Sequence, residues 1–226
     1  MKVRLLSHII EEKMPSYGNH QAAVEIKPKK SLSRGDSCNT FRFSLENHWG
    51  THIDTPAHFF SKGKNIAGYP CAYWIFNKPC LAKVSLSKNM NIGPEQLKQK
   101  IPLDSDLLLI KTGFGRFRKE KKYSLCGPAI KPETAIWLRH NRPGLRAIGF
   151  DFVSVGSFAC RETARKTHRI FLGSGKNKPI PIIEDMDLKG DLSGLKKVFV
   201  APLLIKGLDS ANCTVFGFLK NRKAKK

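Results

Sequence analysis

Acidic residues are scarce in this chain, and their shortage sets its charge. Its 226 residues include 18 aspartates and glutamates against 40 lysines and arginines, which gives a formal net charge of +22. Such a balance attracts phosphates, nucleic acids and acidic membrane surfaces. The basic residues are dispersed, however, and their short runs contain one interleaved aromatic residue, Phe117, which is thin support for base stacking. Charge patterning therefore favours a solvated basic surface over a nucleic-acid function.

Long apolar runs are absent as well. No stretch reaches the roughly 20 residues that a membrane-spanning helix needs. The apolar start of the chain stops at Ile10 and runs into Glu11-Glu12-Lys13, without the small-residue cleavage site of a signal peptide. We therefore expect a cytoplasmic protein with no membrane partner. A hydrophobic fraction of 41% argues against global disorder and is enough to build a core.

The chain has no Cys-x-x-Cys pair and no Gly-x-Ser-x-Gly element. The first absence argues against a zinc ribbon, and the second against a serine hydrolase with a nucleophile elbow. Cys160 precedes His168 by eight residues, but no local signature of a cysteine nucleophile accompanies it. We expect buried, reduced thiols at the six scattered cysteine positions, which are 38, 71, 80, 126, 160 and 213.

Hydrophobic periodicity predicts a mixed α/β (α+β) protein in which strands outnumber helices. In residues 39–48 apolar and polar side chains alternate, with Phe41, Phe43 and Leu45 on one face of a strand. Residues 1–219 are interpreted as one domain and residues 220–226 as a basic tail. The predicted strands are 2–10, 39–48, 80–86, 106–111, 146–151, 198–204 and 214–219; the predicted helices are 94–100, 132–141 and 162–172, followed by a surface loop at 173–181.

Three of the seven histidines and one aspartate fall within eleven residues, at positions 48, 52, 54 and 58. A lone histidine is usually an ordinary polar residue, but such a cluster is typical of a chemical site. All four positions are even, so an extended backbone directs their side chains to one side. Residues four apart in a straight strand are about 13 Å apart, which is too far to share one ion easily. We therefore expect Gly50 to bend the chain, and the imidazole and carboxylate ligands favour Zn²⁺ or Mn²⁺.

The same segment resembles a family signature. The run His48-Trp49-Gly50-Thr51-His52-Ile53-Asp54-Thr55-Pro56-Ala57-His58-Phe59 is similar to the H-x-G-T-H-x-D-x-P-x-H-F motif of the cyclase superfamily, which includes bacterial kynurenine formamidases and isatin hydrolases. Weaker similarity covers nearly the whole chain. It involves residues 14–18, 109–113, 148–151, 182–184 and 201–203.

The resemblance implies a swivelling β/β/α fold with a central mixed sheet or barrel, assembled as a dimer or tetramer. It also implies one or two divalent cations, with Asp54 as the bridging ligand. His58 corresponds to the family's proton donor and acceptor, and Tyr17 to a substrate-contacting aromatic residue that is normally tryptophan. The metal ligands that the resemblance implies are His48, His52, Asp54, His168 and Glu184.

Departures from the family pattern leave alternatives open. Tyr17-Gly18-Asn19 replaces Trp-Pro-Gly, so the substrate pocket differs, and the alternative role for Tyr17 is loop packing. His168 and Glu184 are farther apart than usual, because the loop at 173–181 separates them. Their alternatives are a histidine on a helix surface and a solvated carboxylate.

These observations predict a metal-dependent hydrolase that cleaves a small amide, formamide, lactam or ester, in the manner of an arylformamidase. The basic surface would draw in an anionic small-molecule substrate. Two other classes stay open: a catalytically idle relative that keeps the fold, and a basic protein that binds polyanions. Metal analysis with an amidase panel separates the first from an enzyme, and a steep salt dependence of nucleic-acid binding would support the second.

Overall fold

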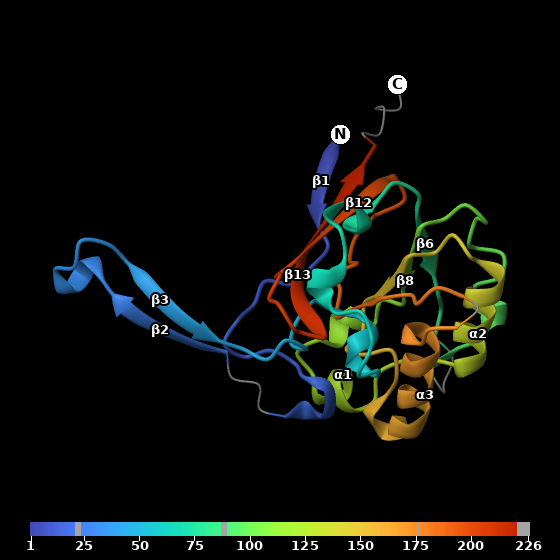
Figure 1. Cartoon of the computed structure of the whole chain (residues 1–226), viewed down its shortest axis with the longest axis horizontal. Helices are drawn as coiled ribbons and strands as arrows, with labels where there is room; N and C mark the ends of the chain where they lie inside the picture. The colour runs from blue at the N-terminus through green and yellow to red at the C-terminus, as the bar shows by residue number, and fades with distance from the viewer. Residues whose placement is uncertain (21–23, 87–89, 176, 221–226) are drawn as a thin grey trace.

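The computed structural model describes residues 1–20, 24–86, 90–175 and 177–220. It confirms a mixed α/β architecture, in which a large, nearly closed mixed sheet carries a few helices against one side (Figure 1). Strand β1 (Lys2–Leu5) pairs with β13 (Ser210–Leu219), so the first strand and the last strand lie side by side (Figure 1). All of the predicted basic tail except Lys220 falls outside the described residues.

The other strands and helices follow in chain order. The remaining strands are β2 (Glu25–Lys30), β3 (Thr40–Ser44), β4 (His52–Asp54), β5 (Ile75–Phe76), β6 (Pro79–Lys83), β7 (Asn91–Ile92), β8 (Leu107–Lys111), β9 (Ala129–Ile130), β10 (Ala147–Phe150), β11 (Ile182–Glu184) and β12 (Leu195–Pro202). The helices are α1 (Lys121–Leu125), α2 (Pro132–Asn141) and α3 (Arg161–Leu172).

The main sheet has the order β5-β12-β13-β4-β11-β10-β8-β6. Strands β6, β8, β10 and β11 run parallel to one another, whereas β4 is antiparallel to both of its neighbours, β11 and β13. Strand β4 therefore joins the parallel half of the sheet to the antiparallel half. In this register His52 lies opposite Glu184 on one side and Asn212 on the other.

The core occupies both faces of the parallel half. On β8, Leu108 and Ile110 pack into a cluster that includes residues of α2 and α3, whereas Leu107 and Leu109 pack into a second cluster beneath β12 and β13. Successive side chains of a strand point to opposite faces, so a strand buried on both faces must be apolar throughout. This requirement explains the unbroken run Leu107–Ile110, which is fully buried.

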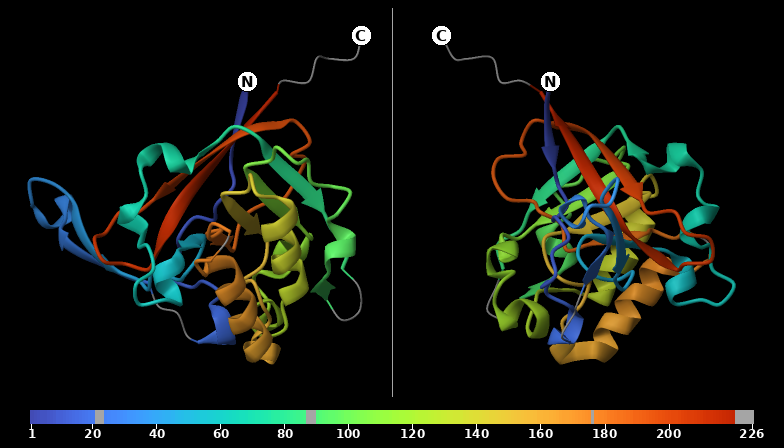
Figure 2. Two further views of the ribbon diagram at one scale, coloured as in Figure 1. Left: turned by 45° about the vertical axis from the view of Figure 1, so that its right-hand side comes forward. Right: turned by 90° about the vertical axis from the view of Figure 1, so that its left-hand side faces the viewer.

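Helix α3 presents one face to this core. Its buried residues are Ala164, Thr167, His168, Phe171 and Leu172, which recur at the three- and four-residue spacing of a helical stripe. Figure 2 shows α2 and α3 side by side against the sheet. His168 Nε2 of α3 lies 3.8 Å from Asp54 Oδ2 of β4. Packing therefore holds His168 next to the segment that carries the other histidines.

Strands β2 and β3 form a hairpin that projects away from the main body (Figures 1 and 2). Ile26 pairs with Phe43 and Pro28 with Phe41, so these four side chains share one face of the hairpin. Phe41 and Phe43 are each 60% exposed. The predicted alternation at 39–48 is therefore confirmed as a strand, but its apolar face does not pack on the chain's own core.

Several predicted elements are shorter in the structure, and three of them differ most. The strand expected at 2–10 ends at Leu5, because the next backbone groups turn to other partners, such as the Thr51 hydroxyl that accepts from His8 N. The strand expected at 39–48 ends at Ser44, before a turn closed by Trp49 N and Glu46 O. The helix expected at 94–100 contains only a 3₁₀ turn, Pro94–Gln96, because so short a helix is marginal without further packing.

The expectation of buried thiols is wrong for most of the cysteines. Only Cys80 and Cys213 are buried, whereas Cys38, Cys71, Cys126 and Cys160 are exposed. Their flanking segments lie on turns and element ends, where the neighbouring backbone is at the surface. Within the described residues no helix is both long and apolar enough to cross a membrane. The cytoplasmic location stays a prediction.

Candidate metal centre

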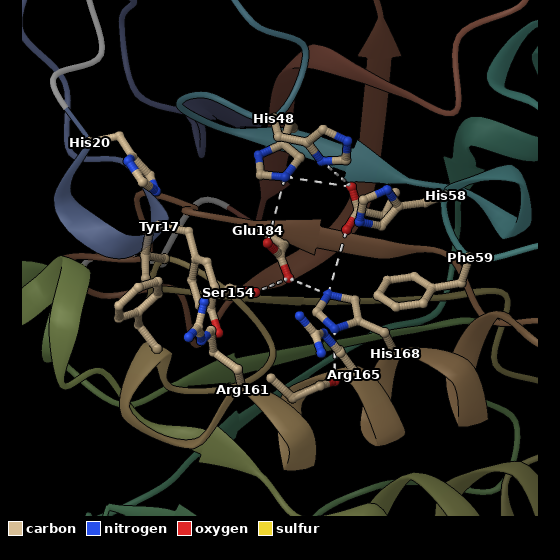
Figure 3. Close-up of a pocket in the computed structure, with 15 residues that line it drawn as sticks. Tyr17, His20, His48, His58, Phe59, Ser154, Arg161, Arg165, His168 and Glu184 are labelled. Carbon is tan, nitrogen blue, oxygen red and sulfur yellow. Dashed lines mark hydrogen bonds and ion pairs between the residues drawn. The ribbon is translucent and has the colours of Figure 1, made fainter.

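The clustered histidines reach the site from different kinds of backbone. Strand β4 carries His52 and Asp54, the loop before it carries His48, and a 3₁₀ turn after it, Pro56–His58, ends at His58. The other two predicted ligands come from distant segments: His168 from the middle of α3, and Glu184 from the end of β11. Figure 3 shows His48, His58, His168 and Glu184 converging on one pocket, which His52 and Asp54 also line.

Gly50 supplies the expected bend between His48 and His52. Its φ is +64°, in the left-handed region that residues with a side chain rarely adopt. The two imidazole rings on either side of the bend have centroids 5.2 Å apart, well under the separation in a straight strand. The bend is thus confirmed, although His48 lies on a loop rather than on the strand that was predicted to include it.

Asp54 lies at the centre of the cluster and is 1% exposed. Its Oδ1 is 3.1 Å from His48 Nδ1 and 3.5 Å from His52 Nε2. Its Oδ2 is 3.8 Å from His168 Nε2. One carboxylate thus faces three imidazoles, and each of its oxygens faces a different part of the cluster.

Glu184 closes the opposite side. Its Oε1 accepts hydrogen bonds from Val155 N at 2.8 Å and Ser154 Oγ at 3.1 Å. These bonds fix the carboxylate so that Oε2 lies 3.5 Å from His52 Nε2 and Oε1 lies 3.4 Å from His168 Nε2. The structure therefore brings His168 and Glu184 together despite the loop that separates them, and neither is solvated: they are 7% and 3% exposed.

Backbone carbonyls set the orientation of two of the rings. The Gly50 carbonyl lies 2.9 Å from His52 Nδ1, and the Ala164 carbonyl lies 2.8 Å from His168 Nδ1. A carbonyl only accepts, so each Nδ1 donates its hydrogen to the carbonyl, and each Nε2 is left to face the carboxylates. This is the arrangement in which a second hydrogen bond orients a histidine for metal binding.

Two buried atoms in the cluster lack a satisfactory partner. Among the described residues, neither His52 Nε2 nor Asp54 Oδ1 makes a well-aligned hydrogen bond. Leaving a buried polar atom unsatisfied costs about 1–3 kcal/mol. Both atoms are electron-pair donors that face the same space, so a cation would satisfy them together. The set of imidazoles and carboxylates, without a thiolate, fits Zn²⁺ or Mn²⁺.

The electrostatics of the cluster favour positive charge. Burial lowers the pKa of His48, but Asp54 and Asp209 outweigh it and raise this pKa to about 10. Burial likewise raises the pKa of Asp54, but His48 and the other histidines hold it well below its ordinary value. The Asp54 carboxylate therefore stays charged and requires neighbouring positive charge, whether protons on the imidazoles or a metal cation.

Asp209 is a site residue that the sequence pattern did not indicate. It immediately precedes β13, and its Oδ2 lies 3.1 Å from His48 Nε2 and 2.7 Å from His58 Nδ1. Across the described ranges, three groups of side chains have ligand atoms that all lie within 4.8 Å of one another: His48/His52/Asp54, Asp54/His58/His168 and His48/His58/Asp209. The sequence offered one indication that Asp209 could matter, which is that acidic residues are scarce in this chain. Only the pairing of the strands connects Asp209 to the motif.

The cluster forms the floor of a cavity of about 390 Å³, within the range of small-molecule sites. Tyr17 lines this cavity, with its hydroxyl donating to the Ser157 carbonyl at 3.2 Å and its ring edge-on to Phe158. Burial raises the pKa of Tyr17 to about 12, so its hydroxyl stays protonated. Tyr17 thus both packs against a loop and faces the cavity (Figure 3), and its contact with substrate stays a prediction.

Comparison with known proteins decides the family. The model of the family described as "Putative cyclase" matches residues 5–157, which is more than half of the chain. The chain belongs to the cyclase family. "Cyclase-like protein 2" of Arabidopsis thaliana is 25% identical over 217 residues, covering 93% of this chain and 76% of the relative. "Kynurenine formamidase" of Bacillus anthracis is 26% identical over 182 residues, covering 80% of each chain.

Solved structures of this family share the fold. Isatin hydrolase A from Labrenzia aggregata superposes with a TM-score of 0.79 at 18% identity, covering 97% of this chain and 94% of its own. A structure described as a potential metal-dependent hydrolase with cyclase activity superposes with a TM-score of 0.73 at 21% identity, covering 97% and 98%. The predicted fold class is therefore confirmed.

We predict that the purified protein binds Zn²⁺ or Mn²⁺ in isothermal titration calorimetry, and that Asp54→Asn weakens binding at least 100-fold. The reason is that, in the part of the chain that the structure describes, Asp54 is the one carboxylate within 4 Å of three imidazoles. Asp187→Asn is the matched control, because Asp187 pairs with Lys189 outside this cluster. Equal affinities for wild type and Asp54→Asn would contradict the assignment.

Proposed function

We propose that this cyclase-family protein is a metal-dependent hydrolase that cleaves a small amide, formamide, lactam or ester. The observation that carries the proposal is a pair of buried ligand atoms without a hydrogen bond, His52 Nε2 and Asp54 Oδ1, at the floor of an accessible cavity. Relatives named kynurenine formamidase and isatin hydrolase support a hydrolase that acts on carbonyl compounds. We further propose His48, His52, Asp54, His168 and Glu184 as the ligands of one or two divalent cations.

The chemistry divides between the cation and the side chains. A divalent cation supplies Lewis-acid polarisation of the scissile carbonyl and makes a nearby water more acidic. The buried carboxylates and imidazoles hold it and exclude bulk water, since His52, Asp54 and Glu184 are each at most 3% exposed. Electrostatic stabilisation of the developing oxyanion is strongest in such a preorganised, water-poor site.

We propose His58 as the group that moves protons. Its side chain is 27% exposed and lines the cavity, so its ring reaches both the buried cluster and the substrate space. Its Nδ1 is held by Asp209, which leaves the other ring nitrogen for the reacting groups. An imidazole in this position takes a proton from water and passes it to the leaving amine or alcohol.

We predict that His58→Ala retains the bound cation but lowers kcat by about 100-fold or more, the typical contribution of a positioned acid–base group. Asp54→Ala loses both the cation and the activity. Hydrolysis of aryl formamides, lactams and esters, read with metal content, tests both variants. Wild-type rates for both would show that the roles are wrong, and a metal-containing wild type that hydrolyses none of these substrates would favour an idle relative.

The cavity wall also suggests the class of substrate. Arg161, Arg165 and His168 recur on one face of α3, and Figure 3 shows both arginines beside the cavity. Among the described residues no carboxylate forms an ion pair with either guanidinium, and Arg161 instead lies over the Phe158 ring. Two arginines without acidic partners beside an aromatic wall favour a substrate with an anionic group and an aromatic body.

We predict that Arg165→Gln raises KM for carboxylate-bearing aryl amides about tenfold, the loss of one charge-assisted hydrogen bond of about 1.5 kcal/mol. KM for uncharged aryl amides stays within about twofold. Steady-state kinetics on the two substrate sets measures the difference. Lys166→Gln, on the next position of α3 but outside this cavity, is the control. An equal change for charged and uncharged substrates would exclude an anion-binding role.

We also propose a homo-oligomer, for which the projecting hairpin offers a surface. A two-stranded hairpin is marginally stable by itself, and this one exposes Phe41 and Phe43 on the same face. A second copy of the chain that covers this face would stabilise the hairpin.

We predict that the wild type is at least dimeric in light scattering, and that the double substitution Phe41→Ser, Phe43→Ser shifts it to a monomer. The physical reason is the loss of the apolar area that drives association. Ile136→Ser, at an exposed position on α2, should leave the mass unchanged. A monomeric wild type, or a double variant of unchanged mass, would contradict the proposal.

A further inference from the structure

The contacts of Asp209 are explained fully neither by a position at the surface nor by a role as a metal ligand. One of its oxygens, Oδ2, lies 2.7 Å from His58 Nδ1 and 3.1 Å from His48 Nε2. The other, Oδ1, accepts from Asn47 Nδ2 at 2.8 Å. A single carboxylate oxygen thus contacts both the proposed proton carrier and a proposed metal ligand.

These contacts determine which ring nitrogens carry hydrogens. A carboxylate oxygen only accepts, so each ring nitrogen that Asp209 Oδ2 contacts has to donate. His58 must therefore carry a hydrogen on Nδ1, and His48 one on Nε2. The remaining ring atoms are His58 Nε2, free to accept a proton, and His48 Nδ1, which faces Asp54 Oδ1 at 3.1 Å and carries a hydrogen there unless a cation takes its place.

The backbone of Asp209 is held independently of its side chain. Its carbonyl accepts from Thr55 N at 3.0 Å and from Thr55 Oγ1 at 2.6 Å. Thr55 follows Asp54 directly and precedes the 3₁₀ turn that ends at His58. The main-chain contacts therefore align the start of β13 with the metal motif, while the carboxylate is left to orient the two rings.

We propose that Asp209 is a positioning residue that fixes the tautomers of His58 and His48 at once, and so couples the proton carrier to the metal cluster. The expected effect of Asp209 on kinetics rests on the proposed hydrolase function. Its expected effects on the histidine tautomers and on cation affinity do not. Carboxylates that accept from metal-binding histidines raise ligand basicity, and their loss typically weakens metal binding 10–100-fold.

The test compares Asp209→Asn with the wild type, both as full-length chains loaded with Zn²⁺. An asparagine keeps the size of the side chain, but its amide offers a donor as well as an acceptor. We expect ¹⁵N NMR of the histidines to show His58 as the Nδ1–H tautomer in the wild type and a loss of that preference in the variant. Competition titration should show Zn²⁺ affinity reduced about 10–100-fold with unchanged stoichiometry.

Kinetics provide the third readout, on whichever aryl formamide the wild type hydrolyses fastest. At saturating Zn²⁺ we expect kcat to fall about 100-fold while KM stays within about twofold, because the substrate does not contact Asp209 in this account. Asn47→Ala removes the donor to Asp209 Oδ1 and should shift all three readouts in the same direction by less. Asp187→Asn should shift none of them.

Specific results would overturn the inference. An unchanged His58 tautomer and unchanged Zn²⁺ affinity in Asp209→Asn would show that the carboxylate positions nothing. Loss of one Zn²⁺ equivalent at saturation would make Asp209 a metal ligand instead. If the wild type hydrolyses no substrate, the proposed function fails, while the NMR and titration results still decide the role of Asp209. If Asp209→Asn does not fold, as judged by circular dichroism, the Asn47→Ala variant decides it.

Discussion

The site depends on one buried carboxylate. Asp54 is almost completely removed from solvent, and its charge has to be balanced locally because burial of an isolated carboxylate is very costly. Three imidazoles from a loop, a strand and a helix provide this balance. The fold serves this requirement: β4 carries Asp54 at the junction of the parallel and antiparallel halves of the sheet, where segments distant in sequence meet.

The register of the sheet and hydrogen bonds to the backbone position the other side chains of the site, and neither requires an additional charged group. The pairing of β4 with β11 places Glu184 opposite His52, and the pairing of β4 with β13 places Asp209 close to the same motif. Carbonyls of Gly50 and Ala164 fix the tautomers of His52 and His168. The cluster is therefore preorganised by the backbone, so that binding a cation requires little reorganisation of the protein.

The sequence allowed the fold class and the core of the motif to be predicted, because both depend on local pattern. Alternation and apolar runs locate strands such as β8, and proline at the first turn marks α2 correctly at Pro132–Asn141. The bend at Gly50 followed from the spacing of His48 and His52 alone. Residue types within eleven positions were enough to indicate a cation site.

What could not be predicted depends on tertiary pairing or on the absence of packing. Asp209 belongs to the site only through the register of β13, which no local pattern encodes. The 39–48 alternation predicted a strand but not that its apolar face would be left uncovered on a projecting hairpin. Four cysteines are likewise exposed, although cysteine is on average among the most buried residue types.

The most direct test of a cation held by this cluster is X-ray absorption spectroscopy of the zinc-loaded protein. We expect a first coordination shell made only of nitrogen and oxygen at about 2.0–2.2 Å, with additional scattering from the more distant ring atoms of more than one imidazole. A sulfur scatterer at about 2.3 Å, or a spectrum of hexa-aquo zinc without imidazole scattering, would contradict it.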